Sequence, residues 1–132
     1  MNMDLKDKYK TPLYKTFTYA FSGIIHGFRK EKNFKIHAAA AILAIFISII
    51  LRISMVEWLF VIISIFGVLT LELINSAIER LVDLTTSDYH PLAKQAKDLA
   101  AGAVLVYSIM TVIIACIIFI PKIAHLYKML IQ

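Results

Sequence analysis

The chain has 132 residues, a formal net charge of +5 and 60% hydrophobic residues, with a mean hydropathy of +0.77. A soluble domain of this size would struggle to bury so much apolar surface, so the composition indicates a membrane protein made of one domain, residues 1–132. Because the basic residues gather beside apolar segments, the positive charge indicates a membrane surface as partner and no nucleic acid.

The first expected helix covers residues 13–34. Its apolar residues recur every three or four positions, at Leu13, Phe17, Phe21, Ile24 and Phe28, with lysine and arginine on either side. This stripe predicts an amphipathic helix on the cytoplasmic leaflet. Packing of the stripe on a neighbouring helix is an alternative, and both interpretations can hold at once. The residues before it are polar and charged, so we expect no signal peptide.

Three further segments predict transmembrane helices, at residues 36–54, 56–84 and 97–120. The last contains "LAAGAVLVYSIMTVIIACIIFI", which has no charged residue and exceeds the roughly 20 residues that cross a bilayer. The first two have shorter charge-free runs, 38–51 and 58–71, which their flanks lengthen. The predicted fold is therefore all-α, with one surface helix and three transmembrane helices. The lone Cys116 fits as a small apolar residue in the last span.

The distribution of basic residues predicts the orientation in the cell membrane. The connection between the first two spans has only Arg52, whereas the segment before the first span is rich in lysine and arginine. The positive-inside rule then places the N-terminus and the 84–98 loop in the cytoplasm and the C-terminus outside. Lys122 and Lys128 run against this assignment but are outnumbered by Lys6, Lys8, Lys10, Lys15, Arg29, Lys30, Lys32, Lys35, Arg80, Lys94 and Lys97.

The second span carries polar residues where an apolar helix should continue, in "ELINSAIERLVD". At about 100° per residue, Glu79, Asp83 and Asn75 lie about −20°, +20° and −60° from Glu72, so all four share one face. An intramembrane carboxylate costs on the order of 2.5–3.5 kcal/mol, which favours a functional role. The alternatives are a hydrogen bond from a protonated Glu72 to another helix, and solvated Glu79 and Asp83 or their pairing with lysines 94 or 97.

Depth separates the carboxylates along this face. If Trp58 marks the outer interface, Glu72 lies about 21 Å into a core about 30 Å thick, and Glu79 lies two turns further, near the cytoplasmic surface. More charged residues gather at that level: Glu31, Asp88, Lys94, Lys97 and Asp98, with Tyr89 and His90. Carboxylates and lysines together suit a Mg²⁺–phosphate ligand. The glycine-rich motifs of common nucleotide folds are missing from the sequence.

Two motifs, "ELINSAIERLVD" and "HPLAKQAKDLAAGAV", resemble the small integral-membrane diacylglycerol kinase family of bacteria. The resemblance includes "EKNFKIHAAAA" and extends from about residue 19 to the end of the third span. "HAAAAI", "VEW" and "HPLAK" look closest to the Gram-positive branch, which includes undecaprenol kinase.

The resemblance implies a homotrimeric bundle whose active sites are shared between subunits and which transfers the γ-phosphate of MgATP to a membrane lipid alcohol. It implies undecaprenol as the substrate, with diacylglycerol as the alternative. Glu72 corresponds to the catalytic base, Glu31 and Glu79 to the carboxylates that hold Mg²⁺ with ATP, and Asp83 to a possible supporting residue. The positions expected to bind ATP are Tyr19, Glu31, Asn75, Glu79, Asp88, Tyr89, His90, Lys97 and Asp98.

The sequence departs from the family at one position that contacts nucleotide. Pro12 stands where some members have an arginine with this role, and Lys10 or Lys15 are candidates to replace it.

Two other classes of protein are alternatives to a lipid kinase. A small multidrug-type exporter also uses an intramembrane glutamate, but it needs no second carboxylate two turns away. A structural subunit needs no polar face. A lone chain would be expected to leave this face toward lipid, which also favours a trimer.

Overall fold

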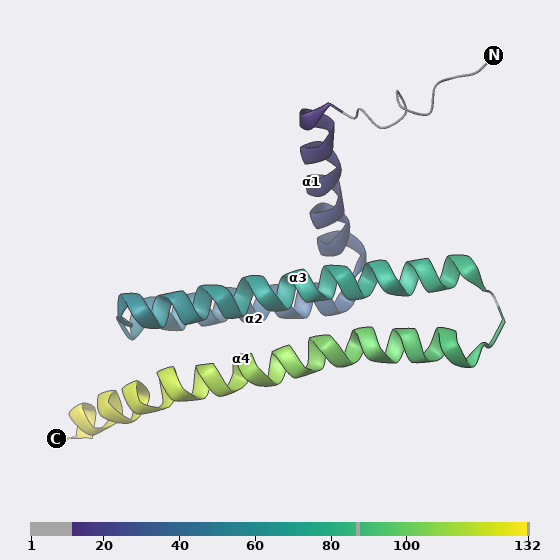
Figure 1. The fold of residues 1–132 in the computed structure, drawn as a ribbon. Coiled ribbons are helices and arrows are strands. Elements are labelled where there is room, and N and C mark those ends of the chain that lie inside the picture. Colours follow the sequence, from purple (N-terminus) through teal and green to yellow (C-terminus); the bar gives the residue numbers. More distant parts are fainter. Residues whose placement is uncertain (1–11, 87, 132) are drawn as a thin grey trace, which may run out of the picture.

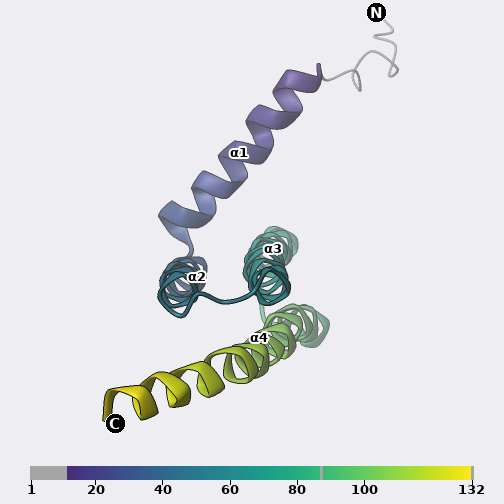
Figure 2. The same ribbon diagram turned by 90° about the vertical axis from the view of Figure 1, so that its left-hand side faces the viewer.

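A computed structural model describes residues 12–86 and 88–131. In these ranges the chain forms four helices and no strand: α1 (Leu13–Lys30), α2 (Lys32–Ile50), α3 (Met55–Thr85) and α4 (Pro91–Ile131). The last three are long and apolar enough to cross a membrane. They run side by side, and α1 points across their long axes (Figures 1 and 2). The predicted all-α membrane fold, one surface helix with three spans, is confirmed.

The α1 helix ends earlier than the expected surface helix, at Lys30 instead of residue 34. Glu31 has an extended backbone, with φ −91° and ψ 117°, and α2 begins at the next residue. The apolar stripe of α1 is exposed in the single chain, with Phe17 at 60% and Phe21 at 64%. Most of the stripe is therefore free to face lipid, while Phe28 packs edge-on against Phe34 of α2 at 4.8 Å between ring centroids.

The turn between α2 and α3 shortens the first expected span, which was predicted to reach residue 54. The α2 helix ends at Ile50, and Arg52 has a positive φ of 47°, a left-handed conformation that a helix cannot accommodate. Ser54 then starts α3 with a capping box: its backbone N–H donates to Glu57 Oε2 at 2.6 Å, and its hydroxyl accepts from the Glu57 N–H at 3.3 Å.

The longest helix, α4, extends beyond the expected span 97–120 at both ends and continues through Pro121. It packs against α3 at Gly67, where any side chain would collide with the ring of Tyr107. The Tyr107 hydroxyl donates to the Ile63 carbonyl at 2.9 Å. Near the α2–α3 turn, Val61 and Ile118 bury together with Ile53. These contacts fix α3 against α4 along the apolar part of the bundle.

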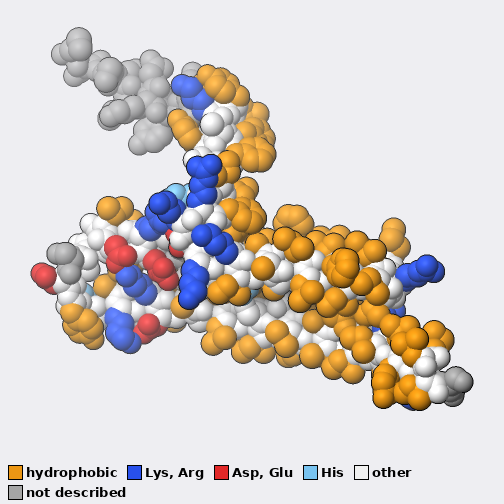
Figure 3. Space-filling model, turned by 180° about the vertical axis from the view of Figure 1, so that it is seen from behind, with side chains coloured by type: hydrophobic (Ala, Val, Ile, Leu, Met, Phe, Trp, Pro, Cys, Tyr) orange, Lys and Arg blue, Asp and Glu red, His pale blue; other side chains and the backbone are white. Residues whose placement is uncertain are grey.

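The surface of the molecule divides into a charged end and an apolar length. In the view of Figure 3, acidic side chains gather where α1 meets the bundle, mixed with lysine and arginine, and hydrophobic side chains cover most of the rest. The charged end holds the end of α3 and the start of α4. The candidate site residues lie there.

Candidate functional site

The predicted polar face of α3 is the inward face of the helix. Glu72 is 3% exposed and Asn75 5%, and the same face continues through Val68, Ser64 and Val61, all buried. The expectation that a lone chain leaves this face toward lipid is therefore wrong for Glu72 and Asn75. The reason is packing: α2 and α4 lie against α3, so these two residues face into the chain's own bundle, while Asp83 at the charged end is exposed.

The polar residues on this face interact with one another and with α2. The Asn75 amide donates from Nδ2 to Glu79 Oε1 at 3.0 Å, while Asn75 Oδ1 is buried and has no hydrogen-bond partner among the described residues. His37 and Asn33 of α2 lie near enough to interact with the Glu72 carboxyl group. The carboxylates of Glu79 and Glu31 lie within electrostatic range of it as well. The face thus presents a buried carboxyl group, an acceptor without a partner, and a second carboxylate nearer the charged end.

One pocket of about 280 Å³ lies between α1, Glu31 and α3. Arg80 Nη2 donates to Glu31 Oε1 at 2.5 Å, and His26 Nε2 lies 4.0 Å from the same oxygen. Tyr19 lines the pocket from α1. The two helices approach closely at Gly27, where a Cβ atom would lie 2.9 Å from the Leu73 side chain. Two of the predicted ATP-binding residues, Tyr19 and Glu31, therefore share one pocket.

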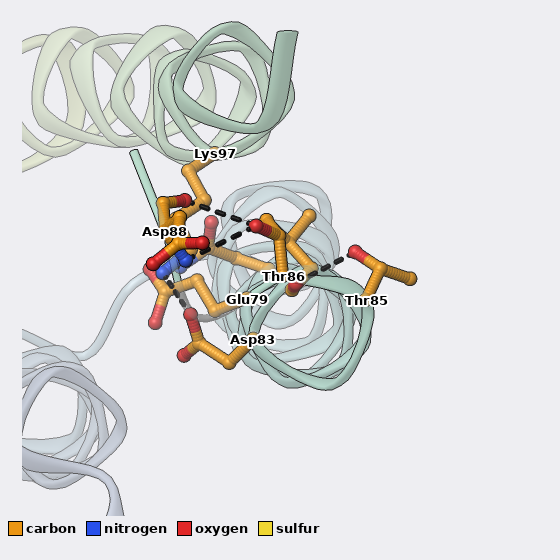
Figure 4. Close-up of polar contacts among 8 residues, drawn as sticks. Glu79, Asp83, Thr85, Thr86, Asp88 and Lys97 are labelled. Atoms are coloured by element: carbon orange, nitrogen blue, oxygen red, sulfur yellow. Dashed lines mark hydrogen bonds and ion pairs between the residues drawn. The ribbon is translucent and has the colours of Figure 1, made fainter. Parts of the chain in front are cut away.

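A second pocket of about 410 Å³ lies between the end of α3, residues 86 and 88–90, and the start of α4. Lys97 Nζ pairs with Asp83 Oδ1 at 2.5 Å, as the pairing alternative for Asp83 anticipated. Lys94 Nζ pairs with Asp98 Oδ2 at 2.7 Å. Figure 4 shows Glu79 and Asp83 projecting from α3 to the side from which Lys97 approaches. Most of the predicted ATP-binding residues line this pocket: Asp88, Tyr89, His90, Lys97 and Asp98.

His90 has a local structural role at the start of α4. Its Nδ1 accepts a hydrogen bond from the Leu92 backbone N–H at 3.2 Å, which satisfies one of the unpaired donors of a helix N-terminus. Tyr89 is 80% exposed. Because Nδ1 already has this partner and no three metal-ligating side chains are grouped among the described residues, His90 fits the lining of a nucleotide pocket better than a metal site.

The two pockets share no residue and open on different faces of α3. At about 100° per residue, Arg80 in the first lies about 60° from Asp83 in the second and about 120° from Thr86. A single chain therefore brings together Glu72, Asn75 and Glu79 along one line. It does not gather all the predicted ATP-binding residues around one ligand.

By themselves, the carboxylates of Glu31 and Glu79 supply only part of the ligands that a magnesium ion needs. Among the described residues, no three His, Cys, Asp or Glu side chains are grouped so that they could hold a metal ion. Mg²⁺ is commonly held by one or two carboxylates together with substrate phosphates, so the donor chemistry of Glu31 and Glu79 suits an ion that arrives with a nucleotide. Glu31 already interacts with a cationic group in this structure, Arg80.

Sequence analysis missed three groups near these carboxylates: His26, His37 and the Glu31–Arg80 pair. Position 31 lies between α1 and α2 and position 80 lies on α3, so helical periodicity has no signal for their contact. Lys15 lies exposed on α1, and Lys10, the other candidate to replace the N-terminal arginine, lies outside the described residues.

Residues 18–119 match the prokaryotic diacylglycerol kinase family. The chain belongs to this family. It is 44% identical over 122 residues to the undecaprenol kinase of Bacillus subtilis, covering 91% of this chain and 99% of that one. It is 34% identical to the diacylglycerol kinase of Escherichia coli, over 82% of this chain and 88% of the relative. The diacylglycerol kinase of Helicobacter pylori is 36% identical, with 71% and 73% covered. The family and its lipid-kinase class are those that the motifs indicated.

Proposed function

We propose that this protein transfers phosphate from ATP to a membrane lipid alcohol, with undecaprenol as substrate ahead of diacylglycerol. The observation that carries the proposal is Glu72, a carboxyl group 3% exposed inside a helix that can span a membrane. It shares a face with Glu79, about two turns or 10 Å closer to the charged end. The preference for undecaprenol rests on the 44% identity to the Bacillus subtilis enzyme.

The proposed mechanism assigns a different task to each carboxylate. Glu72 accepts the proton of the lipid hydroxyl, because it lies at a depth that a lipid alcohol reaches and a soluble one does not. Glu31 and Glu79 hold Mg²⁺, which when bound neutralises phosphate charge. Asn75 lies between the two carboxylates on the same face and donates to Glu79. Phosphoryl transfer depends mainly on such positioning and charge neutralisation.

The nucleotide is proposed to bind at the charged end. Tyr19, Asp88, Tyr89 and His90 supply contacts from two sides of α3, with Asn75, Lys97 and Asp98 and with Asp83 in a supporting role. A homotrimer with shared sites is part of the proposal, because the two pockets of one chain open on different faces of α3. Mixing two inactive variants, one altered at Glu31 and one at Asp98, should restore activity if sites are shared. Full activity of a verified monomer would contradict the trimer.

The orientation is proposed from the basic residues of the N-terminal segment and the 84–98 loop, which place both in the cytoplasm. Cysteines introduced separately at Tyr89 and Ile131, in a Cys116→Ser background, can be labelled from outside intact cells with an impermeant reagent. We expect labelling at 131 and none at 89. The reverse pattern would invert the topology.

The direct test is an assay of the pure protein with labelled ATP and a panel of lipid alcohols in the same mixed micelles. We expect phosphorylation, with kcat/KM higher for undecaprenol than for a diacylglycerol. A clear preference for diacylglycerol would overturn the undecaprenol assignment and leave a lipid kinase. If no lipid in the panel is phosphorylated, the proposed function is overturned and the small multidrug-type exporter becomes the favoured alternative.

A further inference from the structure

The Glu31–Arg80 ion pair joins α3 to the single residue between α1 and α2. Arg80 Nη2 donates to Glu31 Oε1 at 2.5 Å, and the Arg80 side chain is 53% exposed while Glu31 is 21% exposed. One guanidinium nitrogen is therefore engaged, and the remaining N–H donors have no partner among the described residues. A guanidinium has five such donors in a rigid fork that matches the geometry of phosphate.

The charges around this pair indicate a role for Arg80 as the cation of the first pocket. It is the one Lys or Arg that lines the pocket with Tyr19 and Glu31, as far as the described residues go. MgATP is a dianion, and the two carboxylates proposed to hold its metal are anions as well. A phosphate chain bound at Glu31 therefore adds negative charge beside a carboxylate, and a cation within reach of both is needed to offset the repulsion.

We propose that Arg80 is a phosphate-binding residue of the nucleotide site, with its guanidinium in contact with the β- or γ-phosphate when the metal is held at Glu31. This inference rests on the proposed function. The bond of Arg80 to Glu31 keeps the guanidinium beside the carboxylate. When MgATP binds, phosphate oxygens replace Glu31 as the partner of Arg80 or join it. Arginine forms strong paired hydrogen bonds with phosphate as it does with carboxylate.

The rival explanation is a clamp that only holds α1 against α3. A clamp acts only through Glu31, so it has no further effect once Glu31 is replaced, whereas a phosphate-binding residue still distinguishes nucleotides with different numbers of phosphates. The test therefore compares the equilibrium binding of ATP, ADP and AMP, each with Mg²⁺, to the purified full chain, with Arg80 replaced alone and in a Glu31→Gln background. Arg80→Gln removes the charge, and Arg80→Lys keeps it without the fork. Arg29→Gln is the matched control, because Arg29 is exposed near the end of α1 and forms no ion pair among the described residues.

We expect Arg80→Gln to weaken ATP binding by about tenfold or more, and ADP binding as well if the guanidinium contacts the β-phosphate, since arginine forms strong charge-assisted bonds with phosphate. AMP binding should change by less than about twofold, Arg80→Lys should fall between wild type and Arg80→Gln, and Arg29→Gln should match wild type. Unchanged ATP binding, an equal loss for all three nucleotides, or no further loss from Arg80→Gln in the Glu31→Gln background would overturn the inference.

A parallel lipid-phosphorylation assay of the wild-type chain separates this inference from the proposed function. Phosphorylation by wild type together with unchanged ATP binding by Arg80→Gln would remove the role of Arg80 and leave the kinase. Phosphate-dependent loss of binding in Arg80→Gln, with no lipid phosphorylated by wild type, would support the nucleotide site and overturn the lipid kinase.

Discussion

The two halves of α3 are held by different means. From Met55 to about residue 71 the helix packs through small and apolar residues, and Gly67 lets Tyr107 of α4 come close. From Glu72 to Thr85 the helix is polar, and ion pairs join this half to the rest of the chain: Asp83 with Lys97 of α4, and Arg80 with Glu31. The difference indicates that the apolar half fixes the position of the helix and the polar half carries the chemistry. Substitutions in the two halves should therefore fail differently.

The largest effect is expected for Glu72→Gln. Removing a catalytic base should lower kcat by about 10²–10⁴-fold. The binding of MgATP should stay within about twofold of wild type, because Glu72 lies deeper than the proposed nucleotide site. Glu57→Gln is the control: it lies on the same helix, and glutamine retains the capping box with Ser54. A fully active Glu72→Gln enzyme would remove the base assignment.

A smaller loss of a different kind is expected for Glu79→Gln. Replacing a ligand of the metal–nucleotide complex should weaken MgATP binding by about 10–100-fold, since a hydrogen bond or ligand from a charged group contributes about 1.5–3 kcal/mol. Calorimetric titration with ATP at several Mg²⁺ concentrations measures it. If Glu72→Gln and Glu79→Gln lose equal ATP affinity, the two levels of the polar face do not divide the work.

In the apolar half, Gly67→Ala should lower stability and leave the chemistry of folded molecules intact. The added methyl group collides with Tyr107, and overpacking of this kind costs about 1–3 kcal/mol. Gly102→Ala on α4 is the control, because nothing lies within 4 Å of its added Cβ. Thermal unfolding in detergent compares the two. Equal stability of both variants would show that the Gly67–Tyr107 contact does not fix α3 against α4.

The smallest effect is expected from the Asp83–Lys97 pair. Its side chains are 65% and 37% exposed, so solvent screens the interaction, and exposed pairs contribute below about 1 kcal/mol. A double-mutant cycle with Asp83→Asn and Lys97→Met, read by unfolding, measures the coupling. A coupling well above this limit would mean that the polar half also holds the fold together.

The sequence predicts most of this fold because hydropathy and helical period act locally. The three spans follow from apolar length, and the common face of Glu72, Asn75 and Glu79 follows from 100° per residue. What the sequence could not predict depends on tertiary contacts. The burial of Glu72 within one chain arises from how α2 and α4 pack on α3, and the bond of Arg80 to Glu31 joins α3 to the residue between α1 and α2. The end of α1 at Lys30 depends on a single backbone conformation at Glu31.

The one-residue joint at Glu31 also has a mechanical consequence. With α1 18 residues long, its far end lies about 27 Å from the joint, so a 10° tilt of this helix sweeps that end through about 5 Å. A point on the axis of rotation moves hardly at all. Because Glu31 lies at that joint, such a tilt of α1 would leave its carboxylate in place beside α3.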